Sequence, residues 1–386
     1  MVAINESGLR FNPKSLRRVV IKVGSSSIIL NDGMVRLGFL GKLVTTISKL
    51  LKRGTEVVLV SSGAIAMGYK RLGMDKRPVH MEDKQACASV GQSELMALYQ
   101  SLFWTLGIHV GQVLLTRDDL EDRRRYINAR ETLSRLLELG VVPIVNENDS
   151  VSVDEIKFGD NDELSALVSG LIDADLLVLL TDVDGLYDDN PKANGGAHLI
   201  SRIEPPVSRL LELAADGESS MGTGGMRSKL DAADHCSRYG IPCVIAKGRG
   251  SVLEAALSGE EVGTFVLPMD NHIGSRGRWI AKAAGAQGKL IMDAGATRAM
   301  TEGAGSLLPI GVTGVEGRFL RGAVVILADP HGNEVGRGVV RYGADDLRMI
   351  IGKPGEVIED TLGFTFGDRI VHRNDFVLTL ALGDQI

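Results

Sequence analysis

The sequence has few cysteines, few aromatic residues and no long apolar run, and these scarcities exclude several classes of protein. Its three cysteines, Cys87, Cys236 and Cys243, form no CxxC pair, so neither a zinc site nor a disulfide framework is indicated, and we expect all three in the core. No apolar stretch has the length that spans a bilayer, and the first twenty residues lack the apolar centre of a signal peptide. A reducing cytoplasm is the expected location.

An excess of positive charge is also missing. The net charge of −6 argues against broad electrostatic binding to nucleic acid, although a local basic patch stays compatible with it. The triplet Arg123, Arg124 and Arg125 could form a phosphate or RNA patch. Because acidic residues flank it on both sides, we favour a self-neutralised solvated face or a subunit contact.

What the sequence does contain is the pattern of an α/β protein. With 386 residues and 44% hydrophobic residues, the chain can form two or more domains, each with its own core. Apolar strand-like runs alternate with amphipathic helical patterns over the first two thirds, which predicts a sheet covered by helices. We expect strands at residues 19–23, 56–60, 108–115, 141–145, 176–180 and 242–246, and helices at 37–52, 81–106, 117–139, 164–172 and 221–238.

Two small polar turns follow the first two strands. Lys22 lies inside the first strand, which ends in Gly-Ser-Ser-Ser at residues 24–27, and Ser61, Ser62 and Gly63 follow the second. Lys22 could be an edge lysine with its ammonium in water. We favour a ligand role, because open α/β sheets bind ligands at the carboxyl ends of their strands and such turns offer N–H and hydroxyl donors to an anion.

Residues 146–162, NENDSVSVDEIKFGDND, form the most acidic stretch, with six acids, three asparagines and one base, Lys157. We expect a long polar loop between a strand and a helix. A solvated hairpin explains any one of these acids, since Asn and Asp are common in turns. A binding site is indicated only if cationic groups from elsewhere converge on the clusters NEND and GDND.

Two later segments are suited to a nucleotide. Thr181 and Asp182 directly follow a buried strand, a weak signal by itself because Asp also serves in turns. The glycine-rich run at residues 221–229 opens a helix, so backbone N–H groups can approach a phosphate. Lys229 lies one turn into this helix and can reach a terminal phosphate. Its spacing matches neither a Walker A loop nor a dinucleotide fingerprint.

The order of these motifs resembles the amino acid kinase family. The motifs are KVGSS from Lys22, SSGA from Ser61, NEND from Asn146, GDND from Gly159, TD at Thr181 and GTGGM from Gly222 with Lys229, and the tail resembles a PUA domain. The resemblance implies a three-layer α/β sandwich with a mainly parallel sheet, followed by a small β-rich domain. It places the kinase domain at residues 14–266, with 14–172 mainly for the amino acid and 173–266 mainly for ATP, a linker at 267–287 and the PUA-like domain at 288–367.

The implied reaction transfers the γ-phosphoryl group of ATP to the side-chain carboxylate of L-glutamate and gives γ-glutamyl phosphate, a first step towards proline. A carboxylate is already ionised at neutral pH, so no general base is required, and none of the motifs contains a histidine. Mg²⁺ is the implied cofactor. We assign no residue as a metal ligand.

The resemblance also implies roles for individual residues. Lys22 and Lys229 would neutralise the transferred phosphoryl group, and Asp162 would orient both lysines. Ser62, Asp149 and Asn161 would bind glutamate, with Asp149 accepting the α-ammonium group. The residues expected to hold ATP are Lys22, Thr181, Asp182, Thr223, Gly224, Gly225, Met226, Arg227, Ser228 and Lys229.

Alternatives remain open at this point. A related kinase could act on acetylglutamate, aspartate or carbamate, although acetylglutamate lacks the ammonium group that Asp149 would bind. The protein could bind RNA through its tail, but residues 287–367 hold eight Lys or Arg against ten Asp or Glu, a net charge of −2. Proline carries the same ammonium and α-carboxylate groups as glutamate, so we expect it to inhibit the reaction. The arginine-rich segment and the family resemblance suggest a homodimer or homotetramer.

Overall fold

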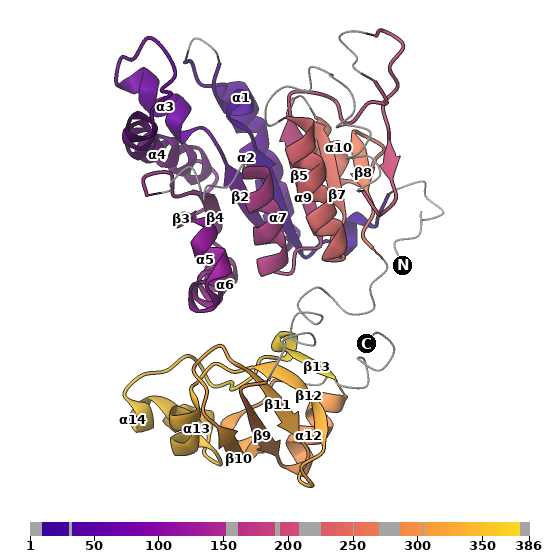
Figure 1. The fold of residues 1–386 in the computed structure, drawn as a ribbon. Helices are drawn as coiled ribbons and strands as arrows, with labels where there is room; N and C mark the ends of the chain where they lie inside the picture. Colours follow the sequence, from indigo (N-terminus) through magenta and orange to yellow (C-terminus); the bar gives the residue numbers. More distant parts are fainter. Residues whose placement is uncertain are drawn as a thin grey trace. The chain divides into compact units, whose positions relative to one another are not determined.

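The computed structural model describes residues 10–30, 33–151, 161–189, 194–207, 225–249, 251–269, 286–302 and 305–378. The chain divides after Asp270 into two compact units, drawn in Figure 1.

The first unit is built on an eight-stranded sheet with the strand order β3-β4-β2-β1-β5-β7-β8-β6. All neighbouring strands are parallel except the pair β7 and β8. The predicted mainly parallel sheet is therefore confirmed. The strands are β1 Arg18–Val23, β2 Glu56–Ser61, β3 Val110–Leu115, β4 Val142–Glu147, β5 Leu176–Thr181, β6 Arg202–Ile203, β7 Cys243–Lys247 and β8 Thr264–Val266.

Helices cover both faces of this sheet, so the three-layer prediction is confirmed as well (Figure 1). Helices α6, α7 and α9 share one hydrophobic core with the sheet, and α2, α4 and α10 share the other. The helices of this unit are α1 Ser25–Ile28, α2 Leu37–Lys52, α3 Ala64–Arg71, α4 Met81–Trp104, α5 Arg117–Glu121, α6 Arg123–Glu138, α7 Asn161–Leu171, α9 Met226–Arg238 and α10 Val252–Leu257, with a 3-10 turn at Pro13–Ser15.

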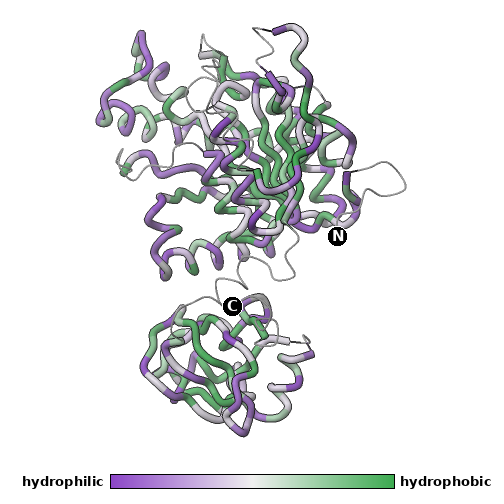
Figure 2. Tube along the Cα trace, turned by 45° about the vertical axis from the view of Figure 1, so that its right-hand side comes forward, coloured by the Kyte–Doolittle hydropathy of each residue, from purple (hydrophilic) through white to green (hydrophobic). Residues whose placement is uncertain are grey.

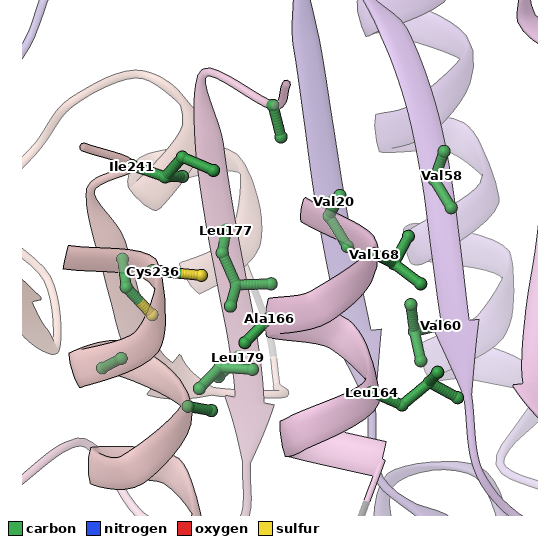
Figure 3. Packing of buried hydrophobic residues seen from close by; sticks show 14 of the residues in the cluster. Val20, Val58, Val60, Leu164, Ala166, Val168, Leu177, Leu179, Cys236 and Ile241 are labelled. Carbon is green, nitrogen blue, oxygen red and sulfur yellow. The ribbon is translucent and has the colours of Figure 1, made fainter. Parts of the chain in front are cut away.

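The strands are almost uniformly apolar because both of their faces are buried. Val20 packs on the side of α7, near Val168, while its neighbours Val19 and Ile21 belong to the opposite core (Figure 3). The hydropathy colouring of Figure 2 shows the same strands as a hydrophobic centre between more polar helices. Cys87, Cys236 and Cys243 are free and buried, as predicted.

One predicted helix is in fact two. The segment expected to be helical over residues 117–139 is interrupted at Asp122, whose carboxylate accepts hydrogen bonds from the backbone N–H groups of Arg124 and Arg125. A new helix begins after Asp122 because its carboxylate accepts hydrogen bonds from N–H groups of the first turn, which otherwise lack partners. Arg125 also pairs with Asp119 at 3.2 Å, which supports a self-neutralised face.

The ends of the acidic stretch were also predicted wrongly. Asn146 and Glu147 belong to β4, and Asn161 and Asp162 begin α7, so these four polar residues are not part of a loop. All four are buried, with exposures between 0 and 8%. A polar pattern suggests a solvated loop unless tertiary partners satisfy the side chains, as they do here. The intervening Asp154, Glu155 and Lys157 lie outside the described residues.

The second unit contains a five-stranded sheet in the order β10-β9-β11-β12-β13, with its own hydrophobic core, which confirms the predicted β-rich module. Its elements are β9 Gly288–Met292, α12 Ala294–Thr301, β10 Val312–Gly317, β11 Val324–Ala328, β12 Glu334–Val339, α13 Ala344–Ile350, α14 Ile358–Leu362 and β13 Phe376–Leu378, with 3-10 turns at Pro309–Gly311, Gly355–Val357 and Arg373–Asp375. Residues 270–285 of the expected linker lie outside the described residues. Across the described part of both units, no helix is long and apolar enough to cross a membrane.

Candidate active site

The candidate site lies at the carboxyl edge of the first sheet. Strands β1, β2, β4, β5 and β7 are parallel, so their carboxyl ends share this edge. From β1 the chain builds the sheet outward in one direction, and from β5 in the other, so the strand order reverses between these neighbours. Open α/β sheets bind ligands at such a reversal.

Segments from β1, β5 and β7 approach one another closely here. A Cβ atom at Gly248, one residue past β7, would lie only 2.9 Å from the Ser27 hydroxyl and 3.5 Å from the Thr181 carbonyl oxygen. The hydroxyl of Thr181 in turn donates to Asp182 at 3.1 Å. The absence of a side chain at Gly248 therefore lets the turn after β1 and the end of β5 meet.

A buried carboxylate bridges two lysines at this edge. The Asp162 carboxylate, in the first turn of α7, has no exposed surface. Its Oδ1 lies 2.6 Å from Lys22 Nζ, on β1, and its Oδ2 lies 3.0 Å from Lys229 Nζ, on α9. The Ser228 hydroxyl also donates to Oδ2 at 2.8 Å, and Lys229 Nζ donates to the Gly225 carbonyl at 2.9 Å. Three elements far apart in sequence thus place two ammonium groups around one anion.

The electrostatics of this cluster favour an anionic ligand. Burial raises the pKa of Asp162, but Lys22 and Lys229 outweigh it and hold that pKa below its ordinary value, so the carboxylate is ionised at neutral pH. Two ammonium groups flank one carboxylate in a place where both lysine side chains are at least nine-tenths buried. Buried ammonium groups are stabilised by anionic partners, and a phosphoryl group is such a partner.

A second group of polar side chains adjoins the cluster through Asn161, the neighbour of Asp162. The Asn161 amide nitrogen donates to the Ser62 hydroxyl at 2.8 Å, to Asn146 Oδ1 at 2.8 Å and to the Ser61 carbonyl at 3.2 Å. The ends of β2 and β4 therefore meet the start of α7. The two ends of the acidic stretch form one site, and cations converge on it as the binding interpretation requires.

The remaining predicted residues are placed as follows. Asp149 lies in the turn after β4 and is partly exposed. Gly225 directly precedes α9, Met226 packs in the core with 8% exposure, and the exposed Arg227 lies 3.9 Å from Asp231. Thr223 and Gly224 lie outside the described residues. The functional roles of all these residues stay predictions.

Sequence reasoning overlooked Gln92 and Tyr99 of α4. Gln92 accepts a hydrogen bond from Asn146 Nδ2 at 2.9 Å, and the Tyr99 hydroxyl lies 2.9 Å from the Ser61 hydroxyl. A signal was present, because Gln92, Leu95, Tyr99 and Phe103 are spaced three or four residues apart. That spacing puts Gln92 on the buried stripe of the helix, where a polar side chain requires a partner.

Comparison with known proteins decides the family. The description "Amino acid kinase family" applies to residues 17–247, and "PUA domain" applies to residues 288–362. The chain belongs to the amino acid kinase family. The kinase-family match includes Lys22, Asp162 and Lys229, and so spans the whole charged cluster. The predicted resemblance is confirmed for both units.

Two of the relatives that this chain matches resemble it over nearly its whole length. "Glutamate 5-kinase" of Syntrophotalea carbinolica is 47% identical over 364 residues, which cover 94% of this chain and 97% of the relative. "Glutamate 5-kinase" of Geobacter sulfurreducens is 46% identical over 365 residues, covering 94% and 98%. Among solved structures, carbamate kinase from Giardia lamblia bound to AMP-PNP covers 66% of this chain and 99% of its own, with 16% identity and a TM-score of 0.48.

Proposed function

We propose that this chain transfers the γ-phosphoryl group of ATP to the side-chain carboxylate of L-glutamate. The observation that carries the proposal is the buried Asp162 carboxylate held between Lys22 and Lys229, which fixes two buried ammonium groups at the carboxyl edge of the sheet, where a phosphoryl group can bind. The choice of glutamate is supported by the relatives that are 46 to 47% identical over almost the full chain and bear the name glutamate 5-kinase.

The chemistry requires charge neutralisation more than proton transfer. The substrate carboxylate is ionised at neutral pH, so one of its oxygens attacks the γ-phosphorus directly while the bond to the β,γ-bridging oxygen breaks and ADP leaves. Lys22 and Lys229 stabilise the negative charge shared by the attacking oxygen, the phosphoryl group and the leaving oxygen. Asp162 acts on the two lysines, because each of its oxygens fixes one ammonium group before the substrates bind.

The two substrates would approach this cluster from different sides. Ser62, Asn161 and Asp149 would hold glutamate, with Asp149 accepting its α-ammonium group, since Ser62 and Asn161 already meet at the start of α7. Thr181, Asp182 and the segment 223–229 would hold ATP at the ends of β5 and at the start of α9.

Mg²⁺ would be bound mainly through the triphosphate. The described residues contain no group of three or more His, Cys, Asp or Glu side chains arranged around one point. Mg²⁺ in phosphoryl-transfer sites is commonly bound by substrate phosphates and water with one or two carboxylates. Phosphate oxygens of ATP and water molecules would therefore suit the ion without a site built from protein side chains alone. When bound, the ion would neutralise part of the charge on the β- and γ-phosphates.

The selectivity for glutamate is open to a direct assay. With ATP, Mg²⁺ and hydroxylamine, which traps acyl phosphates as hydroxamates, we expect kcat/KM for glutamate to exceed that for N-acetylglutamate or aspartate by about 100-fold or more. N-acetylglutamate lacks the charge that Asp149 accepts, and aspartate is one methylene too short to bring its carboxylate to the same point. Equal or faster hydroxamate formation with either competitor would contradict the proposed substrate.

We also propose that proline inhibits the reaction by occupying the glutamate site. Proline carries an ammonium group and an α-carboxylate in the same relation as glutamate, so Asp149 and Asn161 can bind both. The apparent KM for glutamate is expected to rise in proportion to the proline concentration, while the KM for ATP stays constant. Glutamate titrations at several proline concentrations measure this, and an unchanged apparent KM at saturating proline would count against it.

A further inference from the structure

Three buried side-chain amides are linked in a row behind the candidate glutamate site. Gln92 Oε1 accepts from Asn146 Nδ2 at 2.9 Å, and Asn146 Oδ1 accepts from Asn161 Nδ2 at 2.8 Å. The exposures of Gln92, Asn146 and Asn161 are 8, 2 and 8%. The carbonyl oxygens of Gln92 and Asn146 each accept from the amide nitrogen of the next residue in the row, so each amide constrains the orientation of its neighbour.

The row leaves one acceptor unused at the end nearest the charged cluster. The Asn161 amide nitrogen is already engaged by Asn146, Ser62 and the Ser61 carbonyl, whereas its buried Oδ1 has no hydrogen-bond partner among the described residues. A buried acceptor without a partner is unfavourable and indicates a place for a donor. A carbonyl oxygen repels a carboxylate and attracts an ammonium group, so the donor that suits Asn161 Oδ1 is the α-ammonium group of an amino acid.

Helix α4 is well suited to hold this row in place. A Cβ atom at Gly91 would lie 1.8 Å from the Ala64 carbonyl oxygen, and one at Gly68 would lie 1.8 Å from the Cys87 carbonyl oxygen, so the backbones of α3 and α4 are in direct contact. Close-packed backbone contacts of this kind resist displacement. Gln92, which directly follows Gly91, is therefore fixed by the backbone as well as by its own hydrogen bond.

We propose that Gln92 is a positioning residue for the amino acid substrate. It holds the Asn146 amide with Oδ1 towards Asn161, and Asn161 consequently presents its own Oδ1 to the substrate ammonium group. Without Gln92, the Asn146 amide can turn and its NH₂ group competes for that oxygen. The inference rests on the proposed function, because it requires an amino acid as the phosphoryl acceptor.

The test is the Gln92→Met substitution, which keeps the length of the side chain and removes its hydrogen bond. We expect the KM for glutamate to rise about 10-fold, since a contact to a charged group is weakened, while kcat and the KM for ATP change less than about 2-fold. The preference for glutamate over 2-hydroxyglutarate, which has a hydroxyl in place of the ammonium group, is expected to fall in parallel.

Tyr99→Phe is the matched control. It removes a buried hydroxyl from the same helix, and with it the contact to Ser61, but leaves the amide row intact. It is expected to lower the thermal stability without changing the preference for glutamate over 2-hydroxyglutarate. Should Gln92→Met fail to fold, Gln92→Asn retains an amide whose carbonyl is one methylene too short to reach Asn146.

The outcomes separate the inference from the function it rests on. Wild-type protein that forms no hydroxamate from glutamate defeats the proposed function. Active wild-type protein combined with a Gln92→Met variant whose KM for glutamate is unchanged, or whose KM values for glutamate and ATP rise equally, overturns only the role of Gln92. A loss of stability alone, equal to that of Tyr99→Phe, overturns it too.

Discussion

Replacing Lys22 with methionine is expected to lower kcat by about 10³-fold, because the transition state then loses one of the two cations that face the transferred phosphoryl group. Lys229→Met is expected to have an effect of the same order. Both lysines are buried and contact separate oxygens of Asp162, so neither ammonium group can replace the other. The KM for glutamate is expected to change much less than kcat, since the lost interaction belongs to the transition state.

Coupled measurement of ADP release over a range of ATP and glutamate concentrations gives these constants. Lys49→Met is a suitable control, because Lys49 also pairs with a carboxylate, that of Glu254 at 2.7 Å, but on an exposed surface. Its kcat should stay within about 2-fold of the wild type, as expected for a surface ion pair. Near-normal turnover by folded Lys22→Met or Lys229→Met protein would refute the assignment of the charged cluster to catalysis.

Asp162→Asn is expected to damage both turnover and stability. The two ammonium groups then share a buried site without the carboxylate that lies between them, which is expected to lower the free energy of unfolding by about 3–5 kcal/mol. The lysines also lose the anion that fixes their positions, and kcat is expected to fall by about 10²-fold or more. Urea denaturation and steady-state kinetics of the same preparation measure the two effects separately.

The effect of Asp162→Asn on stability is expected to depend on pH, in a direction set by the pKa of Asp162. The folded-state pKa of Asp162 is lowered, so its contribution to stability is complete above the ordinary aspartate pKa of about 3.9 and is lost as the pH falls through the lowered value. The stability difference between wild type and Asp162→Asn should therefore be constant above about pH 5 and shrink below about pH 4. A difference that persists undiminished at the lowest pH where both proteins fold would show that charge is not its origin.

Asp231→Asn provides the control for Asp162→Asn. Asp231 lies on α9, only 3.9 Å from Arg227, and both side chains are more than half exposed. Its replacement should change the free energy of unfolding by less than about 0.5 kcal/mol. The comparison separates the loss of a buried bridging anion from the loss of any carboxylate on a helix.

Much of the first sheet could be predicted because its strands are buried on both faces and read as unbroken apolar runs. Lys22 could be singled out for the same reason, since a lysine within such a run requires a counter-charge. The partner was harder to choose, because six acids lie within residues 146–162 and local sequence does not distinguish them. The family resemblance points to Asp162, and the fold places this residue, at the start of α7, between the lysines.

The errors have a common physical cause. Asn146 and Glu147 continue a strand, and Asp122 divides a helix, because specific hydrogen-bond partners override the local polar pattern. Such partners come from segments distant in the sequence or from the detailed geometry of a cap, so periodicity does not reveal them. The homodimer or homotetramer and the cytoplasmic location stay predictions. RNA binding by the second unit stays the alternative that its net charge of −2 disfavours.

The central claim is that the side-chain carboxylate of glutamate attacks the γ-phosphorus of ATP. The most direct measurement uses glutamate labelled with ¹⁸O in that carboxylate, with ATP, Mg²⁺ and hydroxylamine, and follows released phosphate by ³¹P NMR. Attack by the carboxylate makes one labelled oxygen the bridge to phosphorus, and hydroxylamine then displaces phosphate by attacking the carbonyl carbon. We predict one ¹⁸O atom in each phosphate released; unlabelled phosphate formed at the rate of ADP production would contradict the account.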